Sequence, residues 1–254
     1  MWSRFKKAIH KQLIRVAIGG SIPVETYSQM GEDRILQALF AQKMNSGSPG
    51  YFVDIGAYHP IIYSNTWYFY KRGWCGLNVD ARPGSKELFD RVRPGDTNVE
   101  CAVSDREGAV EFLVLGQDST INRLASNDDK KDDVRMSRHS VSVTARTLNS
   151  LLSQHVPPGG RIDFMSIDIE GEDGAAVLST DWNRFRPTYL LVEQNYRTID
   201  DMAKSETAKY LLQSGYHFFD LCRGYWPPAE LMVRPHPTTL FFVAEEFLGE
   251  SDRA

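Results

Sequence analysis

Residues 51–57 read Tyr-Phe-Val-Asp-Ile-Gly-Ala, an apolar run that ends in an acid and a glycine. A run this short, bounded by a turn signal, is typical of a strand that is buried on both faces of a parallel sheet. The glycine lets the backbone approach a ligand closely, because it carries no side chain. We therefore expect a buried strand whose carboxyl end carries a binding turn.

Helical and strand patterns alternate on both sides of this run. Helical patterns cover residues 31–42, 64–73, 85–93, 148–155 and 200–213. Further strand patterns cover residues 76–81, 98–104, 109–116, 141–148, 162–171, 188–195, 217–226 and 238–247. This alternation predicts an α/β fold with helices on both faces of a mostly parallel sheet. The last two strands follow each other without a helix, which predicts an antiparallel pair at one edge.

Composition narrows the class of protein. The chain has 254 residues, of which 42% are hydrophobic and 24% charged, and this fits one large α/β domain. No apolar stretch approaches the roughly 18 residues that cross a bilayer. The net charge of −4 argues against a nucleic-acid partner, because proteins that bind phosphates usually carry a basic excess. The three cysteines are widely spaced, which indicates a reducing compartment and predicts a cytoplasmic protein.

The first twenty residues differ from the rest, since they contain basic residues and no acid. Apolar residues recur there at helical spacing, namely at Trp2, Phe5, Ile9, Leu13 and Val16. We expect a basic amphipathic helix over residues 1–20, followed by a single domain over 21–254. The helix either lies on anionic lipid at the inner face of the membrane or packs on the domain or a second copy in a homo-oligomer.

Acids end several of the expected strands, at Asp54, Asp80, Asp168 and Glu193. Ligands of open α/β sheets bind beyond the carboxyl ends of the strands, and an acid after the second strand commonly holds ribose hydroxyls. The turn at 54–60 is not Gly-x-Gly-x-x-Gly, which argues against a pyrophosphate and so against an NAD enzyme. A nucleoside cofactor without a diphosphate, such as S-adenosylmethionine, fits this pattern. Each acid alone also fits a helix cap or a turn.

Several segments resemble the FkbM family of S-adenosylmethionine-dependent methyltransferases. They are YSQMGEDRIL (27–36), YFVDIGAYHPIIYSNTWYFYKRGWCGLNVDARP (51–83), IDFMSIDIEGEDGAAVLSTDWNRFRP (162–187) and LLVEQN (190–195). The most specific parts are Ser-Gln-x-Gly-Glu-Asp, His-Pro with Ser-Asn-Thr, and Ile-Asp-Ile-Glu-Gly. The resemblance implies a class I methyltransferase fold, Rossmann-like, with a seven-stranded sheet that is parallel except for its last strand. It also implies O-methylation, often of a sugar or of a hydroxyl on a natural product.

The resemblance also implies a set of cofactor-binding residues. Asp54, Gly56 and Ala57 would line the methionine end of the cofactor, with Ser64 and Asn65 starting the next helix near it. Asp80 would hold the ribose hydroxyls, Ala81 and Arg82 would lie beside the adenosine, and Ala102 and Val103 would flank the adenine. Gln29, Tyr58 and Asp168 complete the set. The chain has Val-Asp-Ala-Arg-Pro where many relatives have Glu-Pro, so the acid is kept although its neighbours differ.

Methyl transfer to an alcohol needs a base within hydrogen-bond reach of the acceptor hydroxyl. Asp168 is the first candidate, because it ends the fourth main strand where the methyl group would lie. His59 is the second, since its ordinary pKa suits a base at neutral pH, although a helix or turn histidine packed against Tyr58 is the simpler interpretation. Glu170 and Glu193 are further candidates.

A metal-dependent alternative uses Asp168, Glu193 and His59 as ligands of a divalent cation that positions the hydroxyl. The sequence has no tight ligand spacing such as His-x-x-x-His, so we do not favour a metal.

A polar stretch at about 117–140 shows no helical or strand period and is expected to form a lid over the acceptor. Tyr225 and Trp226 offer a flat face for a sugar ring, or simply an edge of the core. With the basic N-terminal segment, these features favour a saccharide acceptor on a lipid-linked or surface glycan made in polysaccharide biosynthesis. The alternatives are a tailoring O-methyltransferase for polyketide-type natural products and a non-catalytic nucleotide-fold binding module.

Overall fold

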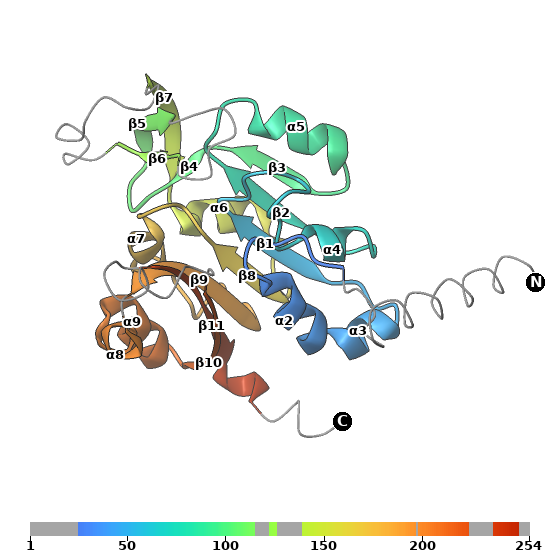
Figure 1. Ribbon diagram of the computed structural model, residues 1–254. Helices are drawn as coiled ribbons and strands as arrows, with labels where there is room; N and C mark the ends of the chain where they lie inside the picture. The colour runs from blue at the N-terminus through green and yellow to red at the C-terminus, as the bar shows by residue number, and fades with distance from the viewer. Residues whose placement is uncertain (1–24, 115–121, 126–138, 197, 224–235, 249–254) are drawn as a thin grey trace, which may run out of the picture.

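A computed structural model describes residues 25–114, 122–125, 139–196, 198–223 and 236–248 (Figure 1). The expected helix over 1–20 and the Tyr225–Trp226 pair lie outside these residues. So does most of the expected lid, of which only 122–125 and the start of a strand at His139 are described. Within the described residues, no helix is both long and apolar enough to cross a membrane.

The described chain forms alternating strands and helices, as the sequence predicts. In chain order they are α2 (Glu32–Leu39), α3 (Ala41–Asn45), β1 (Tyr51–Ile55), α4 (Trp67–Tyr70), β2 (Cys75–Asp80), α5 (Ser85–Val92), β3 (Thr97–Glu100), β4 (Ala102–Val103), β5 (Gly108–Val114), β6 (Arg123–Leu124), β7 (His139–Arg146), α6 (Leu148–His155), β8 (Phe164–Ile167), α7 (Asp173–Leu178), β9 (Tyr189–Tyr196), α8 (Ile199–Lys204), α9 (Glu206–Gln213), β10 (Tyr216–Arg223) and β11 (His236–Ala244). A short 3₁₀ helix (Glu245–Phe247) follows.

The main sheet has seven strands in the order β10-β11-β9-β8-β1-β2-β3. Strands β3, β2, β1, β8 and β9 run parallel, whereas β11 is antiparallel to both of its neighbours. This is the predicted class I methyltransferase architecture, with the expected antiparallel pair at one edge. Because the crossover direction changes between β1 and β8, the carboxyl ends of these two strands form the switch point where ligands bind in such sheets.

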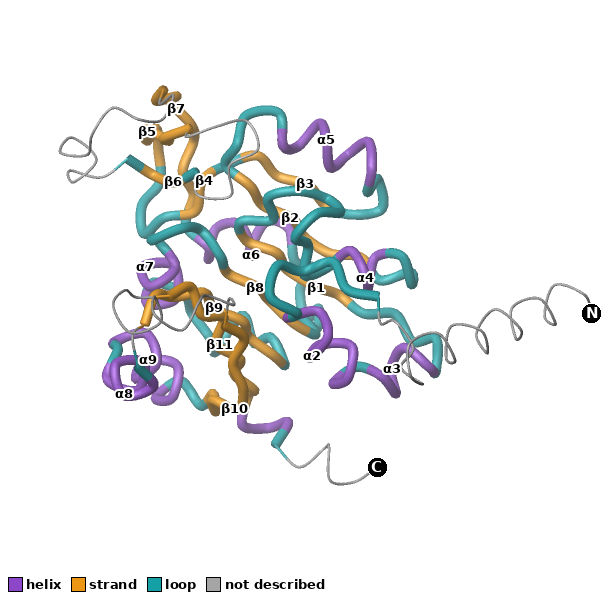
Figure 2. Tube along the Cα trace, viewed as in Figure 1, coloured by secondary structure: helices purple, strands orange, loops and turns teal. Residues whose placement is uncertain are grey.

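A second, four-stranded sheet of order β4-β7-β5-β6 was not expected from the sequence. Residues 98–104 read as one strand, but they divide at Cys101, whose N–H donates to the Asp80 carbonyl. Strand β3 stays in the main sheet, and β4 leaves it to pair with β7. Figure 2 shows β4–β7 as a separate group of strands beside one end of the main sheet.

Three of the expected helices differ in the structure: one is shorter than expected, and two are divided by a single residue. The segment over 64–73 is helical only in α4, because the Ser64 hydroxyl accepts the Trp67 N–H and holds the preceding residues as a turn. Ser205 ends α8 and caps α9 by accepting the Ala208 N–H. The first expected helix is interrupted at Phe40, between α2 and α3.

The two faces of the main sheet carry different cores (Figure 1). Helices α6, α7, α8 and α9 cover an aliphatic face that includes Val53 and Ile55 of β1. Helices α2 and α4 cover an aromatic face that includes Phe52. Since side chains alternate along a strand, Asp54 must share the aromatic face with Phe52.

Candidate functional site

A pocket with about 560 Å³ of free space opens beyond the carboxyl ends of β1, β2 and β8. The pocket is lined by Gly56, Tyr58, Val79, Asp80, Ala81, Arg82, Cys101, Ala102, Val103, Phe112, Asn122, Leu124, Asp168, Ile169 and Glu170. The main sheet therefore supplies the polar end of the pocket, and the second sheet closes it with apolar side chains.

The turn after β1 brings the backbone against its neighbours. The N–H groups of Gly56 and Ala57 both donate to the Val79 carbonyl, at 2.8 and 3.0 Å. Gly56 has a φ of +83°, and a Cβ placed there would lie 1.6 Å from the carbonyl oxygen of Asp168. Only glycine can occupy this position without moving the strand ends apart.

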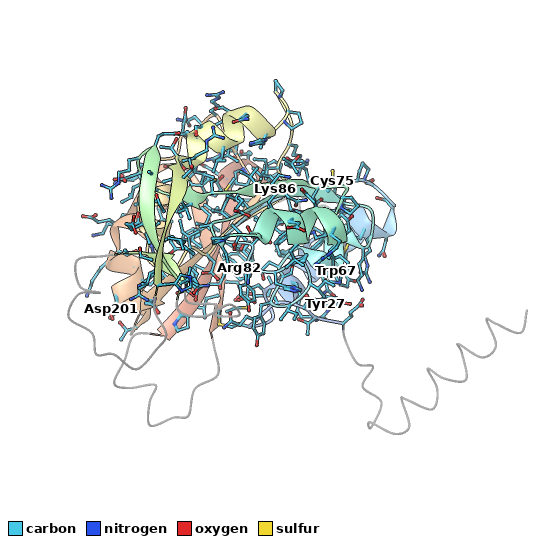
Figure 3. All side chains as sticks on the ribbon, turned by 90° about the horizontal axis from the view of Figure 1, so that it is seen from above. Tyr27, Trp67, Cys75, Arg82, Lys86 and Asp201 are labelled. Carbon is cyan, nitrogen blue, oxygen red and sulfur yellow. The ribbon has the colours of Figure 1, made fainter. Side chains whose placement is uncertain are left out.

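Asp80 organises the side of the pocket next to β2. Its carboxylate accepts the N–H groups of Tyr58 and Arg82, at 2.8 and 2.9 Å. Arg82, labelled in Figure 3, donates through Nη2 to the Tyr58 carbonyl and places its guanidinium 5.0 Å from the Tyr58 ring. Burial raises the pKa of Asp80 to about 6. A carboxylate with two oxygens has further lone pairs that can accept hydroxyl groups of a ligand.

Three carboxyl groups meet where this pocket joins a second one. Oxygens of Asp168, Glu170 and Glu193 lie within 4.8 Å of one another. Burial raises the pKa of Asp168 well above its usual range, and a hydrogen bond with Glu193 adds to the effect. Burial also raises the pKa of Glu170 to about 8, with the charge of Asp168 contributing. Like charges held this close cannot all ionise at low cost, so the cluster retains protons near neutral pH.

The second pocket has about 510 Å³ of free space and a polar lining. Its residues are Asp168, Glu170, Gly171, Asp173, Gly174, Glu193, Gln194 and Asn195. Asp168 and Glu170 line both pockets and therefore form the wall between them.

A sequence model of the family "Methyltransferase FkbM domain" matches residues 54–218, which is more than half of the chain. The chain belongs to the FkbM methyltransferase family. No curated protein sequence matches it significantly.

Solved structures similar to this FkbM methyltransferase are distant from it. One is a TehB-like SAM-dependent methyltransferase from Corynebacterium glutamicum, with 12% identity, a TM-score of 0.40, and coverage of 96% of this chain and 100% of that chain. Another is the O-methyltransferase from Bacillus cereus in complex with SAH, with 10% identity, a TM-score of 0.41, and coverage of 92% and 97%. A putative O-methyltransferase from Klebsiella pneumoniae has 11% identity, a TM-score of 0.45, and coverage of 93% and 96%. At these TM-scores, none of the likenesses assigns a site residue or an acceptor to this chain.

Family membership implies S-adenosylmethionine as the methyl donor, and the first pocket of this FkbM methyltransferase fits it. Asp80 offers a carboxylate for ribose hydroxyls, and Val103, Phe112 and Leu124 offer apolar surface for adenine. Asp168 and Glu170 add carboxyl oxygens to the same lining, which can accept hydrogen bonds from an ammonium group.

The first pocket brings together most of the residues that the sequence predicts for the cofactor. They are Gly56, Tyr58, Asp80, Ala81, Arg82, Ala102, Val103 and Asp168, together with Glu170 from the candidate bases. Glu193 lines the second pocket. The remaining predicted residues line neither pocket in the part of the chain that the structure describes. They are Gln29, Asp54, Ala57, Ser64, Asn65 and His59.

These other residues have structural contacts of their own. Gln29 is exposed ahead of α2. The Ser64 hydroxyl accepts the Trp67 N–H, and Asn65 donates to the Ser166 hydroxyl of β8. Asp54 is 5% exposed and faces the aromatic core. These contacts suit a role in holding the pocket rather than in lining it.

His59 forms part of a turn. Its Nδ1 accepts the N–H groups of Ile61 and Ile62, both at 3.0 Å, and its ring lies 6.3 Å from that of Tyr58. In the described residues, the group that could hold a cation contains Glu170 in place of the predicted His59. The set is then all carboxylate, which is the ligand chemistry of magnesium or calcium.

The sequence predicts Ala102 and Val103 of the second sheet as pocket residues, but it does not predict Phe112 and Leu124. Phe112 falls within a predicted strand that carries no site motif, and Leu124 is one apolar residue within a polar stretch. Their place in the lining depends on how β5 and β6 pair, at Phe112 opposite Leu124. A sequence motif at the end of one strand does not indicate which other strand will pair beside the pocket.

The raised pKa values predict how stability depends on pH when the site is empty. Glu170, with a pKa of about 8, holds its proton in the folded protein at pH values where the unfolded chain has released it. The free energy of unfolding therefore falls as pH rises from about 5 to 8. We expect Glu170→Gln to be more stable than wild type at pH 8.5 by at least about 1 kcal/mol, which is less than the free energy that corresponds to a shift of one pKa unit. This difference in stability should disappear near pH 4.

Urea unfolding at a series of pH values measures this difference. Glu206→Gln, at the exposed start of α9, serves as the control and should follow the wild-type profile. Equal stability of Glu170→Gln and wild type at pH 8.5 would show that the folded protein does not hold Glu170 protonated.

Proposed function

We propose that this FkbM methyltransferase transfers a methyl group from S-adenosylmethionine to a hydroxyl group of a saccharide. The observation that carries the proposal is the polar second pocket, which shares Asp168 and Glu170 with the cofactor pocket. Carboxylates and the amides of Gln194 and Asn195 accept and donate the hydrogen bonds that a polyhydroxylated ligand needs. An acceptor of the polyketide type would call for an apolar lining instead.

The chain's own groups can manage the proton of the acceptor hydroxyl. When bound, S-adenosylmethionine supplies an electrophilic methyl group and a neutral thioether leaving group. Asp168 and Glu193 are hydrogen-bonded, and burial raises the pKa of both, so we infer that the pair shares one proton and leaves an oxygen to accept the proton of the hydroxyl. Asp80 and the turn at Gly56 orient the donor, and the apolar side chains of the second sheet exclude water from it.

Tyr63 supports a sugar acceptor from the other side of the cofactor turn. Its ring is half exposed and stacks on that of Tyr58, with centroids 6.2 Å apart and planes 24° from parallel. Tyr58 itself lines the cofactor pocket. An exposed aromatic face can pack against the apolar face of a pyranose ring.

Incubation with methyl-labelled S-adenosylmethionine and a panel of acceptors tests the proposal. Label is expected in an alkali-stable ether on a saccharide or a lipid-linked saccharide, whereas label in polyketide-type hydroxyls would favour the tailoring alternative. Cofactor binding without transfer to any hydroxyl compound would favour the binding module.

Localisation and partners are also part of the proposal. The basic segment over residues 1–20 favours the cytoplasmic face of a membrane and a lipid-linked acceptor. Co-sedimentation of the full chain with anionic vesicles, compared with neutral ones, tests this part separately. A chelator tests the metal-dependent alternative, since activity that survives chelation excludes a required cation.

A further inference from the structure

Asp54 lies at the end of β1 but does not face the cofactor pocket. Its carboxylate accepts the hydroxyl of Thr66 at 2.9 Å, and Thr66 is fully buried. The same hydroxyl accepts Nη1 of Arg93, also at 2.9 Å. The Thr66 hydroxyl therefore links a buried carboxylate to a buried guanidinium, donating to one and accepting from the other.

Arg93 follows α5 and has no exposed surface. Its Nε donates to Asp96 at 2.8 Å, and its Nη2 lies 2.7 Å from the same oxygen. Its guanidinium carbon is within 5.6 Å of three ring centroids, those of Phe52, Tyr70 and Phe89.

A buried ion pair of this kind is weak evidence for stability, because the cost of desolvating both charges offsets their attraction. A box of three aromatic rings would pack an apolar side chain at least as well. What the guanidinium adds is a set of directed hydrogen bonds. These bonds reach the segment between Gly56 and α4.

That segment carries part of the cofactor pocket and is held at both ends. At its start, the Tyr58 N–H donates to Asp80, and Arg82 donates to the Tyr58 carbonyl. At its end, Nη1 of Arg93 is 3.5 Å from the Pro60 carbonyl and 2.9 Å from the Thr66 hydroxyl.

Two residues within the segment are held in a strained backbone conformation. Tyr58 and Tyr63 have φ values of +52° and +57°. Side-chain-bearing residues adopt such values only where their surroundings impose them.

We propose that Arg93 and Thr66 are positioning residues for the cofactor turn, which they fix by holding Asp54 and the end of the 57–66 segment. The inference rests on the proposed function, since it assigns these groups to the binding of S-adenosylmethionine. None of them touches the pocket, so they act through Gly56 and Tyr58.

The network also gives cofactor binding a pH dependence. Burial raises the pKa of Asp54 to about 6, although Arg93 and the Thr66 hydroxyl lower it. The other charges that act on Asp54 are the carboxylates of Asp96, Asp80 and Asp168. Loss of the Thr66 hydroxyl therefore moves the protonation of Asp54 to higher pH.

The test compares Thr66→Val, which keeps the shape and removes the hydroxyl, with Thr66→Ser, which keeps the hydroxyl. Thr188→Val is the matched control, because Thr188 is also buried and accepts a guanidinium N–H, from Arg161, just before the amino end of β9. Titration with S-adenosylmethionine between pH 5.5 and 8.5 gives the affinities, and hydrogen exchange reports on residues 57–66.

We expect Thr66→Val to bind S-adenosylmethionine five- to tenfold more weakly at pH 7, with its loss of affinity at low pH starting at higher pH than in wild type. Exchange in the 57–66 segment should accelerate, and Thr66→Ser should restore both properties. Thr188→Val should stay within twofold of wild type. Wild-type affinity and exchange in Thr66→Val, or equal losses in Thr188→Val, would overturn the inference. Failure of the wild-type protein to bind the cofactor would instead refute the proposed function, and the exchange data would still decide whether Thr66 holds the segment.

Discussion

Replacing Gly56 by alanine is expected to abolish cofactor binding and to destabilise the protein. A Cβ at this position would lie 1.6 Å from the carbonyl oxygen of Asp168 and 2.7 Å from its carbonyl carbon. Both atoms belong to backbone, so no side-chain rotation relieves the overlap. The carboxyl ends of β1 and β8 must separate, and the residues after both strands line the cofactor pocket.

Gly73→Ala is the matched control for this substitution. Gly73 has a φ of +86°, close to the +83° of Gly56, but a Cβ there would meet no atom within 4 Å. Gly73→Ala should therefore cost only the left-handed backbone strain, about 1–2 kcal/mol. Gly56→Ala should cost about 1–3 kcal/mol more, because overpacking is added to the strain.

Thermal unfolding and titration with S-adenosylmethionine measure both effects. We expect cofactor affinity to fall at least 100-fold in Gly56→Ala and to change less than twofold in Gly73→Ala. Equal stability of the two variants would mean that the turn after β1 does not pack against β8 as described.

Asp168→Asn is expected to reduce turnover far more than it reduces cofactor affinity. Asp168 forms the wall between the two pockets and shares a proton with Glu193. The amide keeps the size of the side chain but cannot take the proton of an acceptor hydroxyl. General-base catalysis contributes about 10²- to 10⁴-fold, so kcat should fall within this range.

The pH profile provides a second readout of the carboxyl pair. Burial and the neighbouring carboxylate raise the pKa of Asp168, so the fully protonated pair persists to higher pH than isolated carboxyl groups would. The turnover of the wild-type protein should rise with pH as this pair loses its proton, and this limb should be missing from any residual activity of Asp168→Asn. Asp200→Asn, at the exposed start of α8, should behave as wild type. An unchanged kcat in Asp168→Asn would exclude Asp168 as the base.

The sequence predicted the main sheet well because short apolar runs with turn signals are local features. The strand at 51–55, its glycine turn and the acid at Asp80 were all placed from such patterns. The division of residues 98–104 at Cys101 was not predictable in this way. It depends on the pairing of β4 with β7, about forty residues away, and no local period records that pairing.

The candidate site was predicted in part, for a related physical reason. Strand ends locate Asp80 and Asp168 at one edge of the sheet, but the direction of a side chain depends on the pleat. Asp54 follows Phe52 on the aromatic face, so its carboxylate points into the core rather than into the pocket. Thr66 belongs to the Ser-Asn-Thr motif, but neither that motif nor the isolated Arg93 indicates that the two residues hold Asp54, which only their contacts show.

Calorimetric titration of the full chain with S-adenosylmethionine tests the central claim most directly, namely that the pocket beyond β1 and β2 holds the methyl donor. We expect one bound S-adenosylmethionine per chain. We also expect about tenfold weaker binding in Asp80→Asn, equivalent to about 1.4 kcal/mol, since ribose hydroxyls lose a charged acceptor. Absence of binding to the folded wild-type protein, or unchanged affinity in Asp80→Asn, would contradict the claim.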